Sequence, residues 1–247
     1  MSLFPKIDYA DTDNVLLVQQ NTLRKLVGVL GVLLPLLLYV FLFIDTHYGK
    51  PLESISHYYF TRVCGIFVIT VSLLAVFLIV YKGKEKIDFY LSTIAGVFAL
   101  VLILFPTNNI SKNEESAQYV VTILRESRFR FWLHYAAAGI FFLCLAAMSL
   151  FLFTKSNKPK ELRTKQKNIR NVIYIICGIA MLVAIVTIFA GLVGIIDSPF
   201  YFSNHLTFWM ETLAVESFGF AWLVKAEVFF KDKFFIKNFY KEKEKIQ

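Results

Sequence analysis

The chain has 247 residues, 57% of them hydrophobic and 17% aromatic, and carries a formal net charge of +8. That length would allow one or two soluble domains, but charged residues are absent from five long stretches, at 26–44, 63–81, 89–111, 131–154 and 171–196. Each stretch reaches the roughly 18 residues needed to cross a hydrocarbon core about 30 Å thick. Because these stretches are apolar on every side, they exclude an ordinary soluble fold.

The N-terminal segment is predicted to lie in the cytoplasm. Residues 1–25 end in the sequence "TDNVLLVQQNTLRK", which predicts a short amphipathic helix over 12–25 with Thr12 or Asp13 as its N-cap. The first apolar span follows at once. Residues 1–24 carry three aspartates against two basic residues, and no small-residue cleavage site follows the span, so we do not expect a removable signal peptide.

The rest of the chain alternates apolar spans with short polar connections. The sequence "YKGKEK" at 81–86 predicts a tight turn, and Pro106 is expected to end the third span. Residues 110–130 form the longest connection, and 155–170 are rich in lysine. The predicted fold class is an all-α polytopic membrane bundle occupying residues 26–224, with about six transmembrane helices at 26–44, 61–81, 88–105, 131–153, 172–196 and 206–224.

The distribution of basic residues predicts how the bundle is oriented. With six spans, 20 of the 26 Lys and Arg residues fall on the side that holds both chain termini, and 6 fall on the other side. The positive-inside rule places the richer side in the cytoplasm. The tail at 225–247 is predicted to be a basic amphipathic segment on the inner leaflet, whose anionic lipids account for the charge. We therefore expect membrane lipids, and no nucleic acid, as partners.

Polar residues gather at the predicted outer ends of the even-numbered spans. Arg62 begins the second span, His134 lies about one turn into the fourth, and Glu211 lies roughly 8 Å into the sixth at about 1.5 Å per residue. Ionisable groups inside a bilayer are costly and usually face the bundle interior or a wet cavity. These residues predict an outward-facing polar pocket, to which we assign Arg62, His134, Glu211, Glu216, Ser56, Tyr59, Glu53 and His57.

Simpler roles remain open for several of these residues. Arg62 could extend to the outer headgroups, and His134 could be a hydrogen-bonded structural histidine. Glu211 and Glu216 are about 140° apart around a helix, so both cannot point to one narrow face. Tyr59 would suit an interfacial aromatic belt whatever the function.

Few catalytic chemistries fit the residue pattern. The three cysteines lie singly inside predicted spans, and the four histidines are scattered without a paired spacing, so we predict neither a metal site nor a cofactor. A serine hydrolase is conceivable, with Ser54 or Ser56 beside His57, His134 and Glu211. No nucleophile-elbow motif marks such a site.

Three sequence segments resemble the FRAG/DRAM/SFK clan of six-span membrane proteins, the damage-regulated autophagy modulator kind, together with related bacterial proteins of a domain-of-unknown-function type. The segments are "ISHYYFTRVCGIFV", "LHYAAAGIFFLCLAAMSLFLFT" and "WMETLAVESFGFAWLVKAE", and the resemblance covers residues 50–227. It implies a connection with lipids, since eukaryotic members are associated with GPI-lipid remodelling, phospholipid distribution and lysosomal or autophagic membranes. By position, the matching residues are Ile55, Ser56, His134 and Glu211. The outer loops depart from the eukaryotic pattern in having no paired cysteines.

The sequence therefore predicts a multi-pass protein of a bacterial inner membrane that binds a lipid headgroup or small amphiphile in its outer half. One alternative is an outer-leaflet lipid hydrolase or transferase that uses His134 and Glu211 as acid and base. Another is a small-solute or proton-coupled transporter that uses Glu211 and Glu216 as carriers. The chain could work alone or as a homo-oligomer.

Overall fold

The computed structural model describes residues 12–83, 85–112, 114–156, 159 and 162–231, with side chains from Gln20 onward. The α-helices are α1 (Thr12–Thr46), α2 (Cys64–Val80), α3 (Lys86–Leu104), α4 (Arg128–Ala147), α5 (Lys165–Leu192), α6 (Ser198–Ser203) and α7 (Leu206–Lys225). Two short 3₁₀ helices, η1 (Ile55–Phe60) and η2 (Glu115–Tyr119), lie in the connections, and η3 (Met148–Leu152) prolongs α4 as a π-helical turn. Within the described ranges the regular structure is helical, apart from one isolated bridge between Thr61 and Val120.

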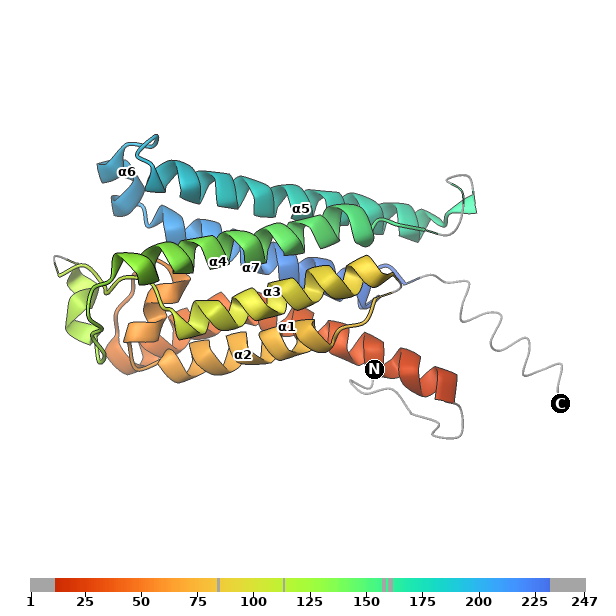
Figure 1. The fold of residues 1–247 in the computed structure, drawn as a ribbon, viewed down its shortest axis with the longest axis horizontal. Coiled ribbons are helices and arrows are strands. Elements are labelled where there is room, and N and C mark those ends of the chain that lie inside the picture. Colours follow the sequence, from red (N-terminus) through yellow and green to blue (C-terminus); the bar gives the residue numbers. More distant parts are fainter. Residues whose placement is uncertain (1–11, 84, 113, 157–158, 160–161, 232–247) are drawn as a thin grey trace.

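The long helices form a closed bundle (Figure 1). From α1 to α5 each long helix packs against the next one along the chain, and α7 lies between α5 and α1. The predicted all-α bundle is therefore confirmed. The amphipathic helix expected over 12–25 runs without a break into the first apolar helix, because both belong to α1. Of the basic tail expected at 225–247, residues beyond 231 lie outside the described part of the chain.

Glycines set the close approach of α1 and α7. A Cβ placed on Gly219 would lie 2.6 Å from the backbone nitrogen of Val32 and 2.7 Å from the carbonyl oxygen of Gly28. The two backbones are too close for a side chain at this crossing. Small residues allow this kind of contact between apolar helices, whose association depends on packing rather than on the exclusion of water.

A cluster of aromatic rings fills the core near the end of the bundle where α2 and α7 finish. Trp222 is 1% exposed and lies at the centre, with ring centroids of Tyr81, Phe153 and Phe218 at 4.8, 5.5 and 5.9 Å, all in edge-to-face geometry. The Lys225 ammonium lies 4.9 Å from the Phe153 ring. Edge-to-face contacts add to the stability gained by burial alone, so this cluster fixes α2, η3 and α7 relative to one another.

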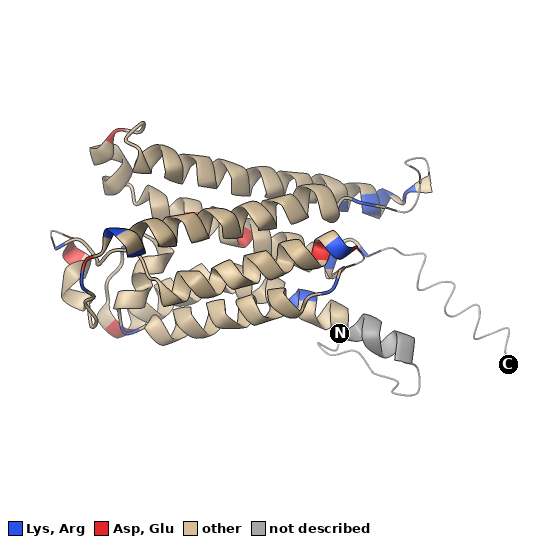
Figure 2. Ribbon diagram, viewed as in Figure 1, with Lys and Arg blue, Asp and Glu red and all other residues tan. Residues whose placement is uncertain are grey.

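Four of the described helices are long and apolar enough to cross a membrane: Gln20–Thr46 within α1, Lys86–Leu104, Arg128–Leu152 and Lys165–Leu192. Helix α2 is equally apolar but has 17 residues, and α7 carries two glutamates along its length. Large hydrophobic side chains such as Leu36, Ile69 and Val186 are more than half exposed on the outside of the bundle. Figure 2 shows the charged residues gathered mainly at the two ends, with a largely uncharged middle. These features are typical of a membrane protein.

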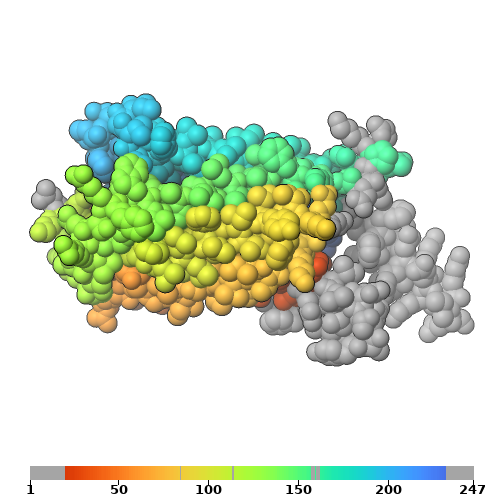
Figure 3. Space-filling model, in the orientation of Figure 1, coloured from red at the N-terminus to blue at the C-terminus, as the bar shows by residue number. Residues whose placement is uncertain are grey.

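The connection between α3 and α4 is fastened over η1. The Val121 N–H donates to the Phe60 carbonyl at 2.9 Å, and the Ser111 N–H donates to the Glu53 carboxylate at 2.8 Å. Asn109 bonds both the N–H and the carbonyl of Leu124, at 3.0 and 2.7 Å, and so closes the loop on itself. Figure 3 shows this connection in light green at the same end of the molecule as the α6 region in blue.

Candidate functional site

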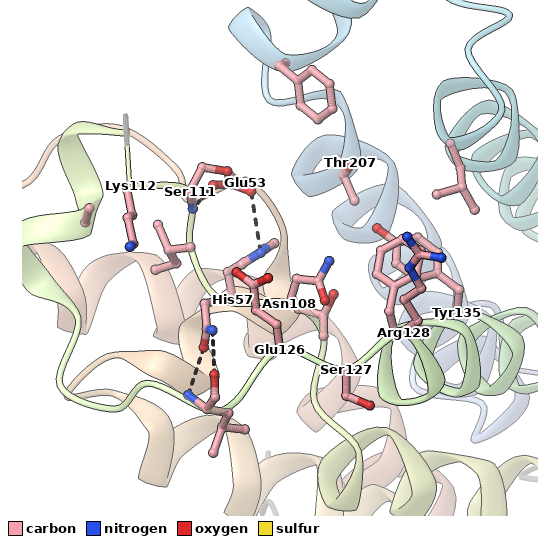
Figure 4. Close-up of a pocket in the computed structure, with 18 of the residues that line it drawn as sticks. Glu53, His57, Asn108, Ser111, Lys112, Glu126, Ser127, Arg128, Tyr135 and Thr207 are labelled. Atoms are coloured by element: carbon pink, nitrogen blue, oxygen red, sulfur yellow. Dashed lines mark hydrogen bonds and ion pairs between the residues drawn. The ribbon is translucent and has the colours of Figure 1, made fainter.

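A large cavity of about 1190 Å³, called here the polar cavity, lies at this same end. It is bounded by η1, the α3–α4 connection, the start of α4, the end of α5 and the α6 region. Its charged and polar lining includes Glu53, His57, Asn108, Lys112, Glu126, Arg128, Tyr135 and Thr207. In the view of Figure 4, Glu126 and Asn108 lie between the Glu53–His57 pair and the Arg128–Tyr135 pair. The cavity thus presents acidic and basic side chains to the same space.

A second cavity of about 130 Å³, called here the narrow cavity, lies between α4 and α5. Ser54, His134 and Glu211 contribute its polar lining together with Thr107 and Tyr135, and the rest is apolar: Ala138, Gly139, Phe142, Ile185, Ile188, Phe189 and Leu192. Phe189 is 59% exposed, so the narrow cavity reaches the outer surface of the bundle.

The two cavities adjoin one another. Thr107 and Tyr135 line both, as do Ile188 and Leu192 of α5. A molecule that occupied both would therefore have a polar part at the end of the bundle and an apolar part between α4 and α5. Thr107 and Tyr135 would contact it where the two parts meet.

Glu211 is held by the backbone of η1. Its carboxylate accepts a hydrogen bond from the Ile55 N–H at 2.6 Å, and the Ser56 N–H is a second backbone donor to it. The first N–H groups of a helix have no partner within the helix, and a carboxylate satisfies them well. Glu211 therefore fastens α7 to the start of η1, in addition to lining the narrow cavity.

His134 is 4% exposed and bonds on both sides of its ring. Its Nδ1 lies 2.9 Å from the Phe105 carbonyl oxygen, and its Nε2 lies 3.1 Å from the Ser56 hydroxyl. A carbonyl can only accept, so this bonding assigns the proton to Nδ1 and leaves Nε2 to accept from Ser56. His134 joins α4 to the end of α3 and to η1.

A second serine–histidine pair lies within η1 and the residue that caps it. The Ser54 hydroxyl is 2.7 Å from His57 Nδ1, and His57 Nε2 is 3.5 Å from the Glu53 carboxylate. Ser54 is 3% exposed and His57 is 7% exposed. Burial lowers the pKa of His57 below its usual value, and the Glu53 carboxylate offsets part of this effect. The shift in pKa thus favours the neutral form of the His57 imidazole.

The structure brings Glu53, His57, His134 and Glu211 to the two cavities, but it does not bring the other predicted site residues to their walls. Arg62 is exposed, and its guanidinium lies 3.4 Å from Asp45. Glu216 is exposed on α7 and lines neither cavity. Tyr59 packs against Phe60, with ring centroids 5.4 Å apart. Ser56 bonds His134 without lining either cavity.

Several lining residues were not assigned to the predicted site, above all Thr107, Glu126, Arg128 and Tyr135. The sequence feature that could have identified Tyr135 as a lining residue is its position next to His134 on the same helix. Glu126 lies in a connection whose course no periodicity predicts, and Arg128 is the first residue of α4. Among the described residues, no three His, Cys, Asp or Glu side chains come together as a metal ion would require.

No protein-family model, curated protein or solved structure matches the chain. The resemblance to the FRAG/DRAM/SFK clan accordingly stays a prediction.

Proposed function

We propose that this chain is a six-span membrane protein that binds an amphiphilic lipid in the two adjoining cavities. The lipid headgroup occupies the polar cavity, and the part of an acyl chain nearest the headgroup lies in the narrow cavity between α4 and α5. Both chain termini are cytoplasmic, so the cavities belong to the outer leaflet. The bacterial inner membrane is the location that the family resemblance implies.

The observation that carries the proposal is that a cavity lined by charged, polar and apolar side chains adjoins a narrow cavity whose lining is mainly apolar. A lipid has the same division along its length, with a charged headgroup and a hydrocarbon chain. Ligand sites typically combine apolar walls with a few convergent polar groups. The narrow cavity also reaches the outside of the bundle beside Phe189, so a lipid could enter sideways from the bilayer.

The charges of the polar cavity favour a zwitterionic headgroup. Besides His57, its charged lining consists of Glu53 and Glu126 on the acidic side and Lys112 and Arg128 on the basic side. Within the described ranges, Glu126, Lys112 and Arg128 make no ion pair with one another or with other side chains. A phosphate would bind Arg128, whose guanidinium suits phosphate oxygens, and an ammonium group would bind the carboxylates.

Native mass spectrometry of the detergent-purified protein tests this proposal. We expect a lipid to remain bound through mild delipidation of the wild type. Gly139→Leu should abolish retention, because a Cβ at Gly139 meets no atom within 4 Å and the added side chain would fill the narrow cavity. Gly65→Leu is the matched control, since a Cβ at Gly65 also meets nothing within 4 Å but lies on α2.

A second matched pair tests the headgroup. Arg128→Ala should weaken retention, whereas Arg62→Ala should not, because Arg62 faces Asp45 outside both cavities. The proposal is wrong if no lipid is retained by the wild type. It is also wrong if Gly139→Leu retains the lipid as well as Gly65→Leu does.

The transporter alternative receives less support. It needs Glu211 and Glu216 to act together, but the Glu211 carboxylate is bonded to backbone N–H groups of η1 and Glu216 is exposed on α7. The hydrolase alternative with His134 and Glu211 as acid and base is likewise disfavoured, because both side chains are engaged in bonds between helices. A different serine–histidine pair offers a better chemical site.

A further inference from the structure

If the ligand is a glycerolipid, the place where the two cavities meet corresponds to a particular chemical group of the lipid. In such a lipid the ester bonds lie between the headgroup and the acyl chains. A lipid seated as proposed above would therefore hold an ester near the residues that line both cavities. Ser54 lines the narrow cavity, and its hydrogen-bonded partner His57 lines the polar cavity. The Ser54–His57 pair thus stands at the junction.

The geometry of this pair fits a nucleophile and its base. The Ser54 hydroxyl is 2.7 Å from His57 Nδ1, within the distance for direct proton transfer. The Glu53 carboxylate lies 3.5 Å from His57 Nε2 and can only accept, so it favours the tautomer with the proton on Nε2. Nδ1 is then free to accept the serine proton. Figure 4 shows the contact between Glu53 and His57 as a dashed line.

We propose that Ser54, His57 and Glu53 form a serine-type acyl-ester hydrolase centre acting on the lipid held in the two cavities. This inference rests on the lipid-binding function proposed above and adds a reaction to it. Ser54 is the nucleophile, His57 the general base, and Glu53 orients the imidazole. The arrangement of roles follows that of other serine hydrolases, although here the serine bonds Nδ1 and the carboxylate faces Nε2.

The reaction balances with water as the only other reactant. Ser54 Oγ attacks the ester carbonyl carbon while its proton passes to His57 Nδ1. The bond to the glycerol oxygen breaks, and that oxygen takes the proton from His57 and leaves as the alcohol of a lysolipid. A water molecule then attacks the acyl group on Ser54, gives its proton through His57 to the serine oxygen, and releases the fatty acid. Hydroxyl donors for the carbonyl oxygen are available from Thr107 and Tyr135, which line both cavities.

The neighbouring pair of Ser56 and His134 provides a natural control. Its hydroxyl-to-nitrogen distance of 3.1 Å is also that of a hydrogen bond. Ser56, however, lines neither cavity, and His134 is fixed between Phe105 and Ser56. Two serines two residues apart, each bonded to a histidine, therefore differ in their access to a substrate.

Labelling of the full-length wild-type protein with a fluorophosphonate probe tests the assignment. The probe phosphonylates a serine whose proton is taken by a nearby base, with loss of fluoride. We expect peptide mass spectrometry to locate the label on Ser54 and not on Ser56. This measurement needs no variant, so it does not depend on whether a substitution folds.

Two variants then test the role of the base. His57→Gln should lower the labelling rate roughly 100-fold, within the range typical of a general base, while Ser56→Ala should leave the rate unchanged. The hydrolase proposal is overturned if no serine is labelled, if Ser56 carries the label, or if His57→Gln labels as fast as the wild type. Native mass spectrometry of the same samples separates the two proposals. A retained lipid without a labelled Ser54 would leave lipid binding intact and remove only the reaction.

Discussion

At the scale of single residues, Glu211 and Glu216 form an instructive pair on one helix. The Glu211 carboxylate accepts the Ile55 N–H at 2.6 Å, whereas Glu216 is exposed. Because a buried N–H that loses its acceptor costs about 1–3 kcal/mol, we expect Glu211→Ala to lower the free energy of unfolding by about 2 kcal/mol. Glu216→Ala should change it by less than about 0.5 kcal/mol, as exposed substitutions usually do.

Denaturant unfolding in detergent micelles measures both effects. Glu211→Gln offers a finer comparison, since its amide oxygen can still accept one of the two backbone N–H groups that bond the carboxyl group, and we expect its stability to fall between those of the wild type and Glu211→Ala. Equal stability of Glu211→Ala and Glu216→Ala would show that Glu211 does not fasten α7 to η1.

The placement of Glu211 and His134 was partly predictable from the sequence. Glu211 and His134 were predicted to converge because ionisable groups within apolar helices seek partners, and the structure places both on the narrow cavity. The sequence could not supply their actual partners, which are backbone groups at Ile55 and Phe105. Every residue has a backbone carbonyl and every residue except proline has a backbone N–H, so no side-chain pattern marks them. Arg62 was assigned to the pocket for the same reason as Glu211, yet Asp45 at the end of α1 lies nearer.

At the scale of elements, the crossing of α1 and α7 depends on glycine. A Cβ on Gly219 would lie only 2.6 Å from the Val32 backbone nitrogen, so the helices must separate to accept it. We expect Gly219→Ala to lower the free energy of unfolding by about 1–3 kcal/mol, the usual cost of overpacking. Gly65→Ala is the control, because a Cβ there meets no atom within 4 Å. Denaturant unfolding in micelles again provides the measurement.

Equal stability of the two alanine variants would contradict this account of the crossing. A loss confined to Gly219→Ala would instead support α7 as the helix that closes the bundle, since it is the element that packs against both α1 and α5.

The elements themselves were largely predictable, and their connections were not. The long helices follow from uncharged apolar stretches, such as 89–111 for α3, whose end at Leu104 agrees with the expected stop before Pro106. Helix η1 was not predicted, because six residues of mixed polarity carry no periodic signal. The α3–α4 connection depends on long-range bonds such as that of Ser111 to Glu53, 58 residues apart. The polar cavity forms between these connections, which is why sequence reasoning found only part of its lining.

At the scale of the whole molecule, the charges are divided between the two ends of the bundle. The α2–α3 and α4–α5 connections are rich in lysine and arginine, and the opposite end carries the polar cavity with its mixed charges. If the basic end faces the cytoplasm, the cavities open toward the outer leaflet. The location of the proposed lipid site therefore depends on the orientation of the bundle.

Cysteine labelling of intact cells tests that orientation. Cys64 is partly exposed and is first changed to Ala, and the buried Cys144 and Cys177 give the background reactivity. A membrane-impermeant maleimide should label Lys112→Cys, beside the polar cavity, in intact cells. It should label Lys82→Cys, between α2 and α3, only after the cells are permeabilised. The reverse pattern would place the cavities on the cytoplasmic side and would move the proposed lipid to the inner leaflet. Labelling of both positions in intact cells would mean that α3 does not cross the membrane, and the six-span topology would then be wrong.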